Sequence, residues 1–153
     1  GLLLATMAGT ALVMDIYVDD YIIAQGELAG ILPESLEKSR QVATNMRENL
    51  RRAHEAGANI VFGTDSGVYP HGDNAIQFSY MIRFGMSPLD AIRSSTLKAA
   101  VLLDMATDVG LIAPGYFADL IAVDGNPLLD ITLLEDVQVV VKGGRVIKGL
   151  ELR

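Results

Sequence analysis

The segment NIVFGTDSGVYPHGDN, residues 59–74, contains the pattern that decides the fold. It begins with Asn59 to Phe62, which read as a short buried strand, and a glycine-rich turn containing Asp65 follows at once. Pro70 and His71 come next along the chain. Asp65 can be a turn former, a helix cap or the working carboxylate of an active site, and its position alone leaves all three alternatives open.

A helix and a second strand are predicted before this segment. Apolar residues recur at three- and four-residue spacing along 33–57, where Pro33 suits the first turn and Gly57 suits the end of a helix. Residues 11–18, ALVMDIYV, have the β-branched and aromatic composition of a strand. Strand, helix and strand in this order form a βαβ unit with parallel pairing. We therefore expect Asp65 just past the carboxyl end of a parallel strand, where α/β proteins bind ligands.

Two further helices and a hairpin are predicted after this segment. Residues 75–84 have helical periodicity and end at Gly85, and a helix from Ser87 to about Leu103 begins with a capping box completed by Asp90. Glycine, proline and short apolar runs then replace the helical pattern, and Gly143-Gly144 is predicted to turn a hairpin between Val137–Val141 and Val146–Ile147. We place a boundary near residue 108, between an α/β portion, 1–108, and a β-strand portion, 109–153.

The remaining polar residues give weaker indications of a site. His71 lies in a loop shaped by its neighbours and is either a solvated residue or a ligand. His54 lies near the end of the long predicted helix, where it complements the helix dipole, and we assign it no function. The other candidate oxygen ligands are carboxylates whose spacing matches no calcium loop, and we interpret them as solvated turn acids: Asp15, Asp19, Asp20 and Asp73.

The composition excludes several classes of function. The chain has 153 residues, half of them hydrophobic, and a net charge of −7 without a long basic run, so nucleic acid is not an expected partner. The apolar start of the chain lacks a basic flank and is interrupted by acids, so we expect neither a signal peptide nor a membrane anchor. The absence of cysteine excludes thiolate chemistry and disulfides but is compatible with a cytoplasmic or a periplasmic location.

Several segments taken together resemble the C-terminal part of the amidohydrolase superfamily. The similarity is to its imidazolonepropionase-like and Xaa-Pro dipeptidase (prolidase) branch. The matching pieces occur in the family's order: GANIVFGTDSGVYPHGDN, MIRFGMSPLDAIRSSTLKAAVLLDM and VGLIAPGYFADLIAVDGNPL with VVVKGGRVI. The resemblance implies the α/β fold class, with the C-terminal part of a metal-dependent-hydrolase (β/α)8 TIM barrel followed by strands of a small β-sandwich domain.

The resemblance also implies a site. Asp65 matches the aspartate of the last barrel strand, which binds a divalent metal, zinc being the expected ion, and accepts the proton of the attacking water. His71 matches a substrate-side residue of the loop that follows. The implied reaction is hydrolysis of an amide or peptide bond, with a dipeptide or another small molecule as substrate.

The family's other metal ligands have no counterpart in this sequence. The His-x-His pair, the bridging lysine or glutamate and the two later histidines are missing, and a barrel of about 250 residues does not fit in this chain. We therefore expect a fragment that is inactive alone and that forms a homo-oligomer or associates with the missing N-terminal part. The alternative is a non-catalytic interaction or scaffold fragment without a metal site.

Overall fold

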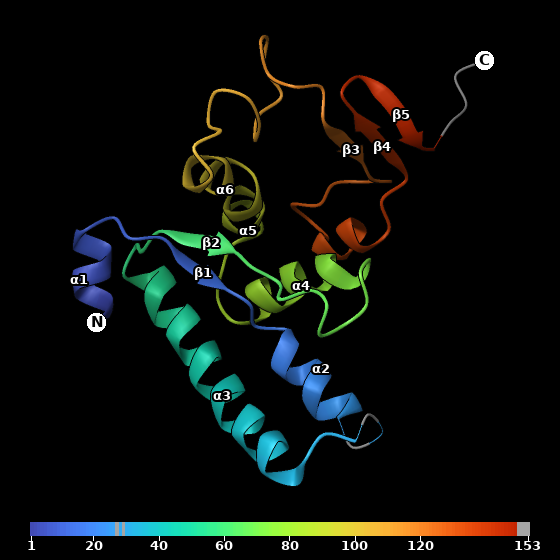
Figure 1. The fold of residues 1–153 in the computed structure, drawn as a ribbon. Coiled ribbons are helices and arrows are strands. Elements are labelled where there is room, and N and C mark those ends of the chain that lie inside the picture. The colour runs from blue at the N-terminus through green and yellow to red at the C-terminus, as the bar shows by residue number, and fades with distance from the viewer. Residues whose placement is uncertain (27, 29, 150–153) are drawn as a thin grey trace.

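The chain contains both helices and short strands in its computed structural model (Figure 1). The model describes residues 1–26, 28 and 30–149. The α-helices are α1 (Leu2–Met7), α2 (Val18–Gln25), α3 (Pro33–Glu55), α4 (Ile76–Arg83), α5 (Pro88–Ser95) and α6 (Leu97–Leu102). Short 3-10 helices are η1 (Asp73–Ala75) and η2 (Ile131–Glu135), and the strands are β1 (Leu12–Met14), β2 (Ile60–Phe62), β3 (Leu120–Ala122), β4 (Val139–Lys142) and β5 (Arg145–Lys148).

Strands β1 and β2 pair in parallel, which confirms the predicted pairing across the long helix. Leu12 lies opposite Ile60 and Met14 lies opposite Phe62. Helix α3 covers one side of the pair, and α5 and α6 lie on the other (Figure 1). Within the described ranges β1 and β2 pair only with each other, so these residues do not close a barrel.

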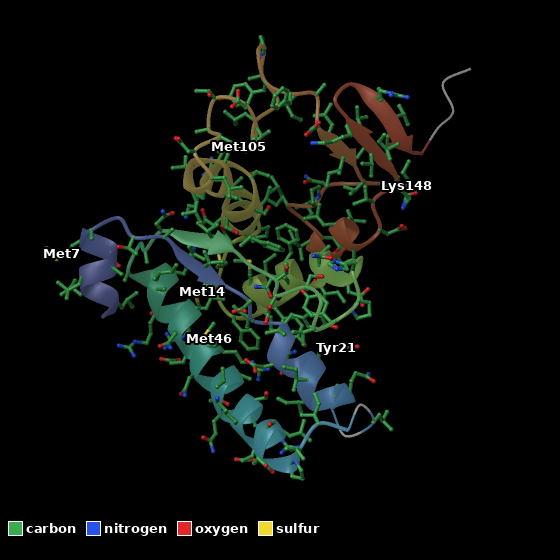
Figure 2. The ribbon with its side chains drawn as sticks, viewed as in Figure 1. Met7, Met14, Tyr21, Met46, Met105 and Lys148 are labelled. Atoms are coloured by element: carbon green, nitrogen blue, oxygen red, sulfur yellow. The ribbon has the colours of Figure 1, made fainter. Side chains whose placement is uncertain are left out.

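The core around this pair is apolar and draws on helices α3, α4 and α5. Leu50 of α3 and Met81 of α4 are fully buried in it, and Met46 of α3 packs against the same cluster as Met14 of β1 (Figure 2). Such burial stabilises by roughly 1.5–3 kcal/mol per large apolar side chain. The helices are therefore held against the parallel pair mainly by hydrophobic packing. No helix in the described part of the chain is long and apolar enough to span a bilayer.

The predicted strand at 11–18 is too long. Strand β1 ends at Met14, and helix α2 begins at Val18, with Tyr17 at its N-cap position. The strand stops because the side chain of Gln77 takes up the backbone groups that follow it, as described below. The β-branched and aromatic residues of this stretch are therefore shared between a strand end and a helix start, which composition alone does not separate. Helix α1, at the start of the chain, was not predicted from the sequence.

The predicted helix from Ser87 to Leu103 is two helices. The break is at Thr96, whose φ and ψ of −115° and −91° are not helical. Three consecutive hydroxyls bond back to carbonyls of the same helix: Ser94 to Ala91, and both Ser95 and Thr96 to Ile92. Such back-bonding competes with the helical ladder and bends helices.

The predicted N-terminal cap of this segment is confirmed, and it also connects two helices. The Ser87 hydroxyl accepts the Asp90 N–H at 3.1 Å and donates to the Asp90 carboxylate at 2.7 Å. His54 in the last turn of α3 lies 3.2 Å from the same carboxylate. The hydrogen bond from Ser87, then that from His54, lowers the pKa of Asp90. The ionised carboxylate therefore stabilises the fold above its unfolded pKa, and this contribution is lost as the pH falls through the lowered folded value.

Strands β3, β4 and β5 form a separate antiparallel sheet. The predicted hairpin is confirmed, with strand bounds shifted by one or two residues. Gly143 and Gly144 both have positive φ, 55° and 77°, which a two-residue turn between right-twisted strands requires. Asp119 accepts a hydrogen bond from the Gly143 N–H at 2.7 Å and pairs with Lys142. The boundary near residue 108 stays a prediction.

Candidate active site

The carboxyl ends of β1 and β2 bring two aspartates to one edge of the parallel pair. The Gly63 N–H bonds to the Met14 carbonyl at 3.0 Å and continues the pairing one residue beyond β2. Gly63 is required sterically, because a Cβ there would lie 2.7 Å from the Val13 side chain. Asp15 directly follows Met14, and Asp65 follows Gly63 by two residues. The predicted position of Asp65, just past a parallel strand, is therefore confirmed.

Asp65 lies in a tight loop and has its carboxylate exposed. Its φ of 50° is in the left-handed region, which aspartate and asparagine tolerate better than most residues. The loop is held by the Val68 N–H to the Asp65 carbonyl and by the Ser66 N–H to the Thr64 hydroxyl. The helix-cap interpretation of Asp65 is wrong, because the next N-cap residues are Gly72 and Ala75. A turn role and a catalytic role are compatible with this geometry.

Asp15 is half-buried, and the charge of Asp65 acts on it. Burial raises the pKa of the Asp15 carboxyl above its ordinary value, its own backbone N–H lowers that pKa, and the charge of Asp65 raises it further. Within the residues the structure describes, none of the ion pairs includes Asp15. The interpretation of Asp15 as a solvated turn acid is therefore wrong, since it is a half-buried carboxylate beside another carboxylate.

Gln77 holds the backbone on both sides of Asp15. Its side chain is fully buried, and its Oε1 accepts the N–H groups of Ile16 and Tyr17, each at 3.0 Å. Its Nε2 donates to the Met14 carbonyl at 2.7 Å. The Gln77 amide therefore satisfies three backbone groups, and these hydrogen bonds fix the amide in a single orientation. Because Gln77 lies on α4, which follows the Asp65 loop, it couples the two strand ends.

Tyrosine rings pack beside the same edge. Tyr17 contacts Tyr69 edge-on, with ring centroids 4.9 Å apart, and Tyr21 lies 5.9 Å from Tyr69. The Tyr69 side chain is 2% exposed, and its hydroxyl has no hydrogen-bond partner in the described part of the chain. Burial raises the pKa of Tyr69, and Tyr17, Asp15 and Asp65 raise it further. The Thr64 side chain lowers this pKa, although no hydrogen bond of ordinary geometry joins Thr64 to the Tyr69 hydroxyl.

The other predicted candidates lie in different surroundings. His71 is exposed in the loop, with Nδ1 3.2 Å from the Ser66 hydroxyl. Asp19 is buried and Asp20 pairs with Arg47, so they too are not solvated turn acids. Asp73 begins η1. His54, to which no function was assigned, forms the contact with Asp90 described above.

The described residues do not assemble a metal centre by themselves. No group of three or more His, Asp or Glu side chains in the described ranges is close enough to hold a metal ion. Two carboxylates at one edge are hard oxygen donors suited to a divalent cation, but a zinc site commonly has three or four protein ligands. These two carboxylates therefore fit one part of a metal site.

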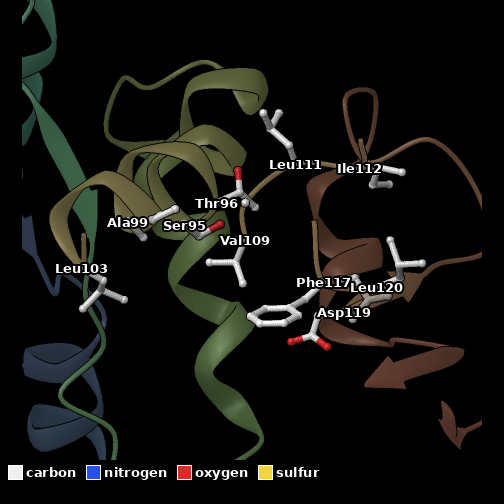
Figure 3. A pocket seen from close by; sticks show the side chains of 13 residues that line it. Ser95, Thr96, Ala99, Leu103, Val109, Leu111, Ile112, Phe117, Asp119 and Leu120 are labelled. Atoms are coloured by element: carbon white, nitrogen blue, oxygen red, sulfur yellow. The ribbon is translucent and has the colours of Figure 1, made fainter. Parts of the chain in front are cut away.

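A cavity of about 340 Å³ lies away from this edge, between α5–α6 and the antiparallel sheet (Figure 3). Its lining is mostly apolar and includes Val109, Phe117 and Leu120. The one carboxylate in its lining belongs to Asp119, which is already engaged by Lys142. This cavity offers packing surface rather than catalytic groups.

Comparison with known families assigns the chain to one of them. The model of the amidohydrolase family matches residues 5–147, which include both strand ends, the Asp65 loop and the antiparallel sheet. The chain belongs to the amidohydrolase family. The resemblance inferred from the sequence motifs is thereby confirmed.

Solved structures of this family match the chain over nearly its whole length. The crystal structure of a Xaa-Pro dipeptidase with bound methionine in the active site superposes with a TM-score of 0.89 at 38% identity, covering 97% of this chain and 37% of that one. A prolidase complexed with N-methylphosphonate-L-proline superposes with a TM-score of 0.88 at 31% identity, covering 97% and 37%. Ochratoxinase from Aspergillus niger is 33% identical over 137 residues, 86% of this chain and 28% of that protein. This amidohydrolase chain therefore spans 37% of each of the two solved chains and 28% of ochratoxinase.

Sequence reasoning missed Gln77 and Tyr69. Gln77 was placed in a helix and given no role, although a polar residue between Ile76 and Phe78 on an apolar helix was a detectable signal. Tyr69 stands in the quoted loop, but nothing in the pattern indicated that its hydroxyl is buried. Gln77 acts through Met14, Ile16 and Tyr17, and Tyr69 packs against Tyr17 and Tyr21, so both depend on a segment that lies far earlier in the chain.

Proposed function

We propose that this chain supplies part of the active site of a metal-dependent amidohydrolase that hydrolyses the amide bond of a dipeptide, in the manner of a Xaa-Pro dipeptidase. The observation that carries the proposal is an exposed carboxylate, Asp65, held in a left-handed turn at the carboxyl end of a parallel strand. Membership of the family and the similarity to prolidase structures support the choice of reaction.

In this proposal the chain forms the last part of a (β/α)8 barrel and strands of a small β-sandwich domain. The parallel pair β1–β2 contributes two barrel strands, and β3–β5 contribute to the small domain. The remaining strands and metal ligands come from a preceding segment of the complete enzyme. Within the described ranges, the outer edges of β1 and β2 have no strand partner. Neighbouring barrel strands would pair with these two edges.

Each proposed residue has a chemical role. Asp65 would hold a divalent cation, zinc being the expected ion, which when bound acidifies a water molecule. The Asp65 carboxylate then accepts the proton of the attacking water and passes it to the leaving nitrogen of the amide. His71, exposed in the following loop, contacts the substrate. The exposed carboxylate of Asp65 suits proton transfer because nothing in its loop occupies it.

Metal removal tests this function. We expect the full-length protein that contains this chain to hydrolyse Ala-Pro, to lose at least about 90% of its turnover on dialysis against a chelator, and to recover with Zn²⁺ or Mn²⁺. The steady-state rate of proline release measures this turnover. The 153-residue chain alone, which is expected to be inactive, is the control. Turnover that survives chelation with no bound metal in elemental analysis would contradict the proposal, and an absence of turnover would favour the alternative, a non-catalytic scaffold fragment.

Exposed apolar surface leads to a second expectation, association. Leu3, Leu4 and Met7 of α1 are 72%, 71% and 78% exposed, and Figure 2 shows Met7 at the periphery of the molecule. Such a surface, with unpaired strand edges nearby, favours binding to another part of the enzyme or to a second copy. We expect the isolated chain to elute as an oligomer, with light scattering giving its mass. A monodisperse monomer would count against this expectation.

A further inference from the structure

The loop of residues 64–76, here called the site loop, begins and ends at one backbone oxygen. Gly63, directly before the site loop, donates its N–H to the Met14 carbonyl at 3.0 Å. Gln77, directly after the loop, donates its side-chain Nε2 to the same carbonyl at 2.7 Å. A carbonyl oxygen has two lone pairs, and these two hydrogen bonds use both of them. Both ends of the site loop are therefore fixed to the last residue of β1.

A third attachment holds the middle of the site loop to the same segment. The Tyr69 ring is buried and packs edge-on against the Tyr17 ring, with centroids 4.9 Å apart. Gln77 fixes the backbone that carries the Tyr17 ring, because its Oε1 accepts the N–H of Tyr17 and also that of Ile16, each at 3.0 Å. These three attachments of the site loop therefore all lead to residues 14–17.

The hydrogen bonds inside the site loop determine its shape but not its place. The Val68 N–H bonds to the Asp65 carbonyl, and the Ser66 hydroxyl lies 3.2 Å from His71 Nδ1. Both contacts join residues of the site loop to each other, so they are kept when the loop moves as a whole. The place of Asp65 and His71 relative to the strands therefore depends on the attachments to residues 14–17.

We propose that Gln77 is a positioning residue, which holds the site loop closed on β1 and thereby keeps Asp65 and His71 in place for the reaction. This inference rests on the function proposed above and adds a residue to the same site. All three hydrogen bonds of the Gln77 side chain go to backbone groups, so Gln77 supplies neither charge nor proton to the reaction. A displacement of about 1 Å can lower a rate about a hundredfold, which sets the scale of the effect.

The first test is the turnover of Gln77→Met in the full-length protein loaded with metal. Methionine is unbranched, fills a similar space and makes none of the three hydrogen bonds. We expect kcat for Ala-Pro to fall at least about tenfold, because the proposed metal ligand and base leaves its place. Steady-state kinetics measure this loss at a temperature at which circular dichroism shows the variant to be folded.

Leu36→Ala is the control for a loss of stability without a change at the site loop. Leu36 is buried near the start of α3, beside Gly26. Truncation of a buried leucine destabilises the fold, while the hydrogen bonds of Gln77 stay in place. We expect kcat of this variant within about twofold of the wild type. An equal fall of kcat in the two variants would show that Gln77 serves stability alone and would overturn the inference.

Nitration of Tyr69 measures the position of the site loop without any reaction. Because the Tyr69 ring is buried, we expect tetranitromethane to nitrate it at least about tenfold faster in Gln77→Met than in the wild type or in Leu36→Ala, as followed by mass spectrometry. Faster nitration without turnover in the wild type would support the role of Gln77 and overturn the proposed reaction. Turnover in the wild type, with kcat and nitration unchanged in Gln77→Met, would overturn the role of Gln77 and leave the reaction standing.

Hydrogen exchange in the wild type covers the case in which Gln77→Met does not fold. The N–H groups of Ile16 and Tyr17 bond to Gln77, and the Gly63 N–H bonds to the carbonyl that Gln77 shares. A loop held closed by Gln77 releases all three amides in one opening, so we expect their protection factors to agree within about tenfold. A larger difference, in either direction, would overturn the inference.

Discussion

Asp65→Asn in the full-length protein is expected to lower kcat/KM for Ala-Pro by about a thousandfold or more. Loss of a general base alone costs about 10² to 10⁴ in rate, and loss of a metal ligand adds to it. Asparagine keeps the size of the side chain and tolerates the left-handed backbone of this position, φ 50°, so the loop is expected to stay folded. Steady-state kinetics and elemental analysis for bound metal measure the two losses separately.

Asp104→Asn provides a matched control for this substitution. Asp104 is the other non-glycine residue with positive φ, 57°, among the described residues, and it is exposed beyond α6. The same chemical change in the same backbone conformation is expected to leave kcat/KM unchanged. Both variants should also melt within about 2 °C of the wild type, as for surface substitutions. Activity that persists in the Asp65→Asn protein would remove Asp65 from the mechanism.

Gln77→Leu is expected to destabilise the isolated chain by about 3–5 kcal/mol. Leucine fills the space but leaves two backbone N–H groups and one carbonyl, at Ile16, Tyr17 and Met14, without their partner. Each unsatisfied buried group costs about 1–3 kcal/mol, and this loss is a large fraction of the roughly 5–15 kcal/mol that stabilises a domain. Chemical denaturation measures it. Gln41→Leu on the exposed face of α3 is the control, with an expected change within about 0.5 kcal/mol.

Gln77→Glu distinguishes hydrogen bonding from packing at the same position. A protonated carboxyl reproduces the amide, because one oxygen accepts the two N–H groups and the O–H donates to the Met14 carbonyl. Burial beside that carbonyl raises the pKa of the introduced carboxyl above its unfolded value of about 4.3. The variant should therefore match the wild type best below that pH and lose stability as the pH rises through the folded pKa. A stability difference from the wild type that is constant between about pH 4 and pH 8 would contradict this account.

The sequence predicts the local elements better than it predicts the candidate site. The long helix, the turn at Gly143-Gly144 and the cap at Ser87 follow from spacing and turn chemistry within a few residues, and the structure confirms them. The break at Thr96 was missed because hydroxyls that bond back to a carbonyl leave no periodic trace in the sequence. The end of β1 was missed because a residue distant along the chain decides it.

The sequence by itself determined the α/β class, the parallel pairing across the long helix and the position of Asp65 at a strand end. These features depend on periodicity and on local turn residues, which neighbouring amino acids specify. Only the tertiary structure decided that Asp15 is half-buried beside Asp65, that Gln77 holds its backbone and that the Tyr69 hydroxyl lacks a partner among the described residues. Burial and side-chain hydrogen bonds between distant segments depend on the folded arrangement of the chain, and no short pattern encodes them.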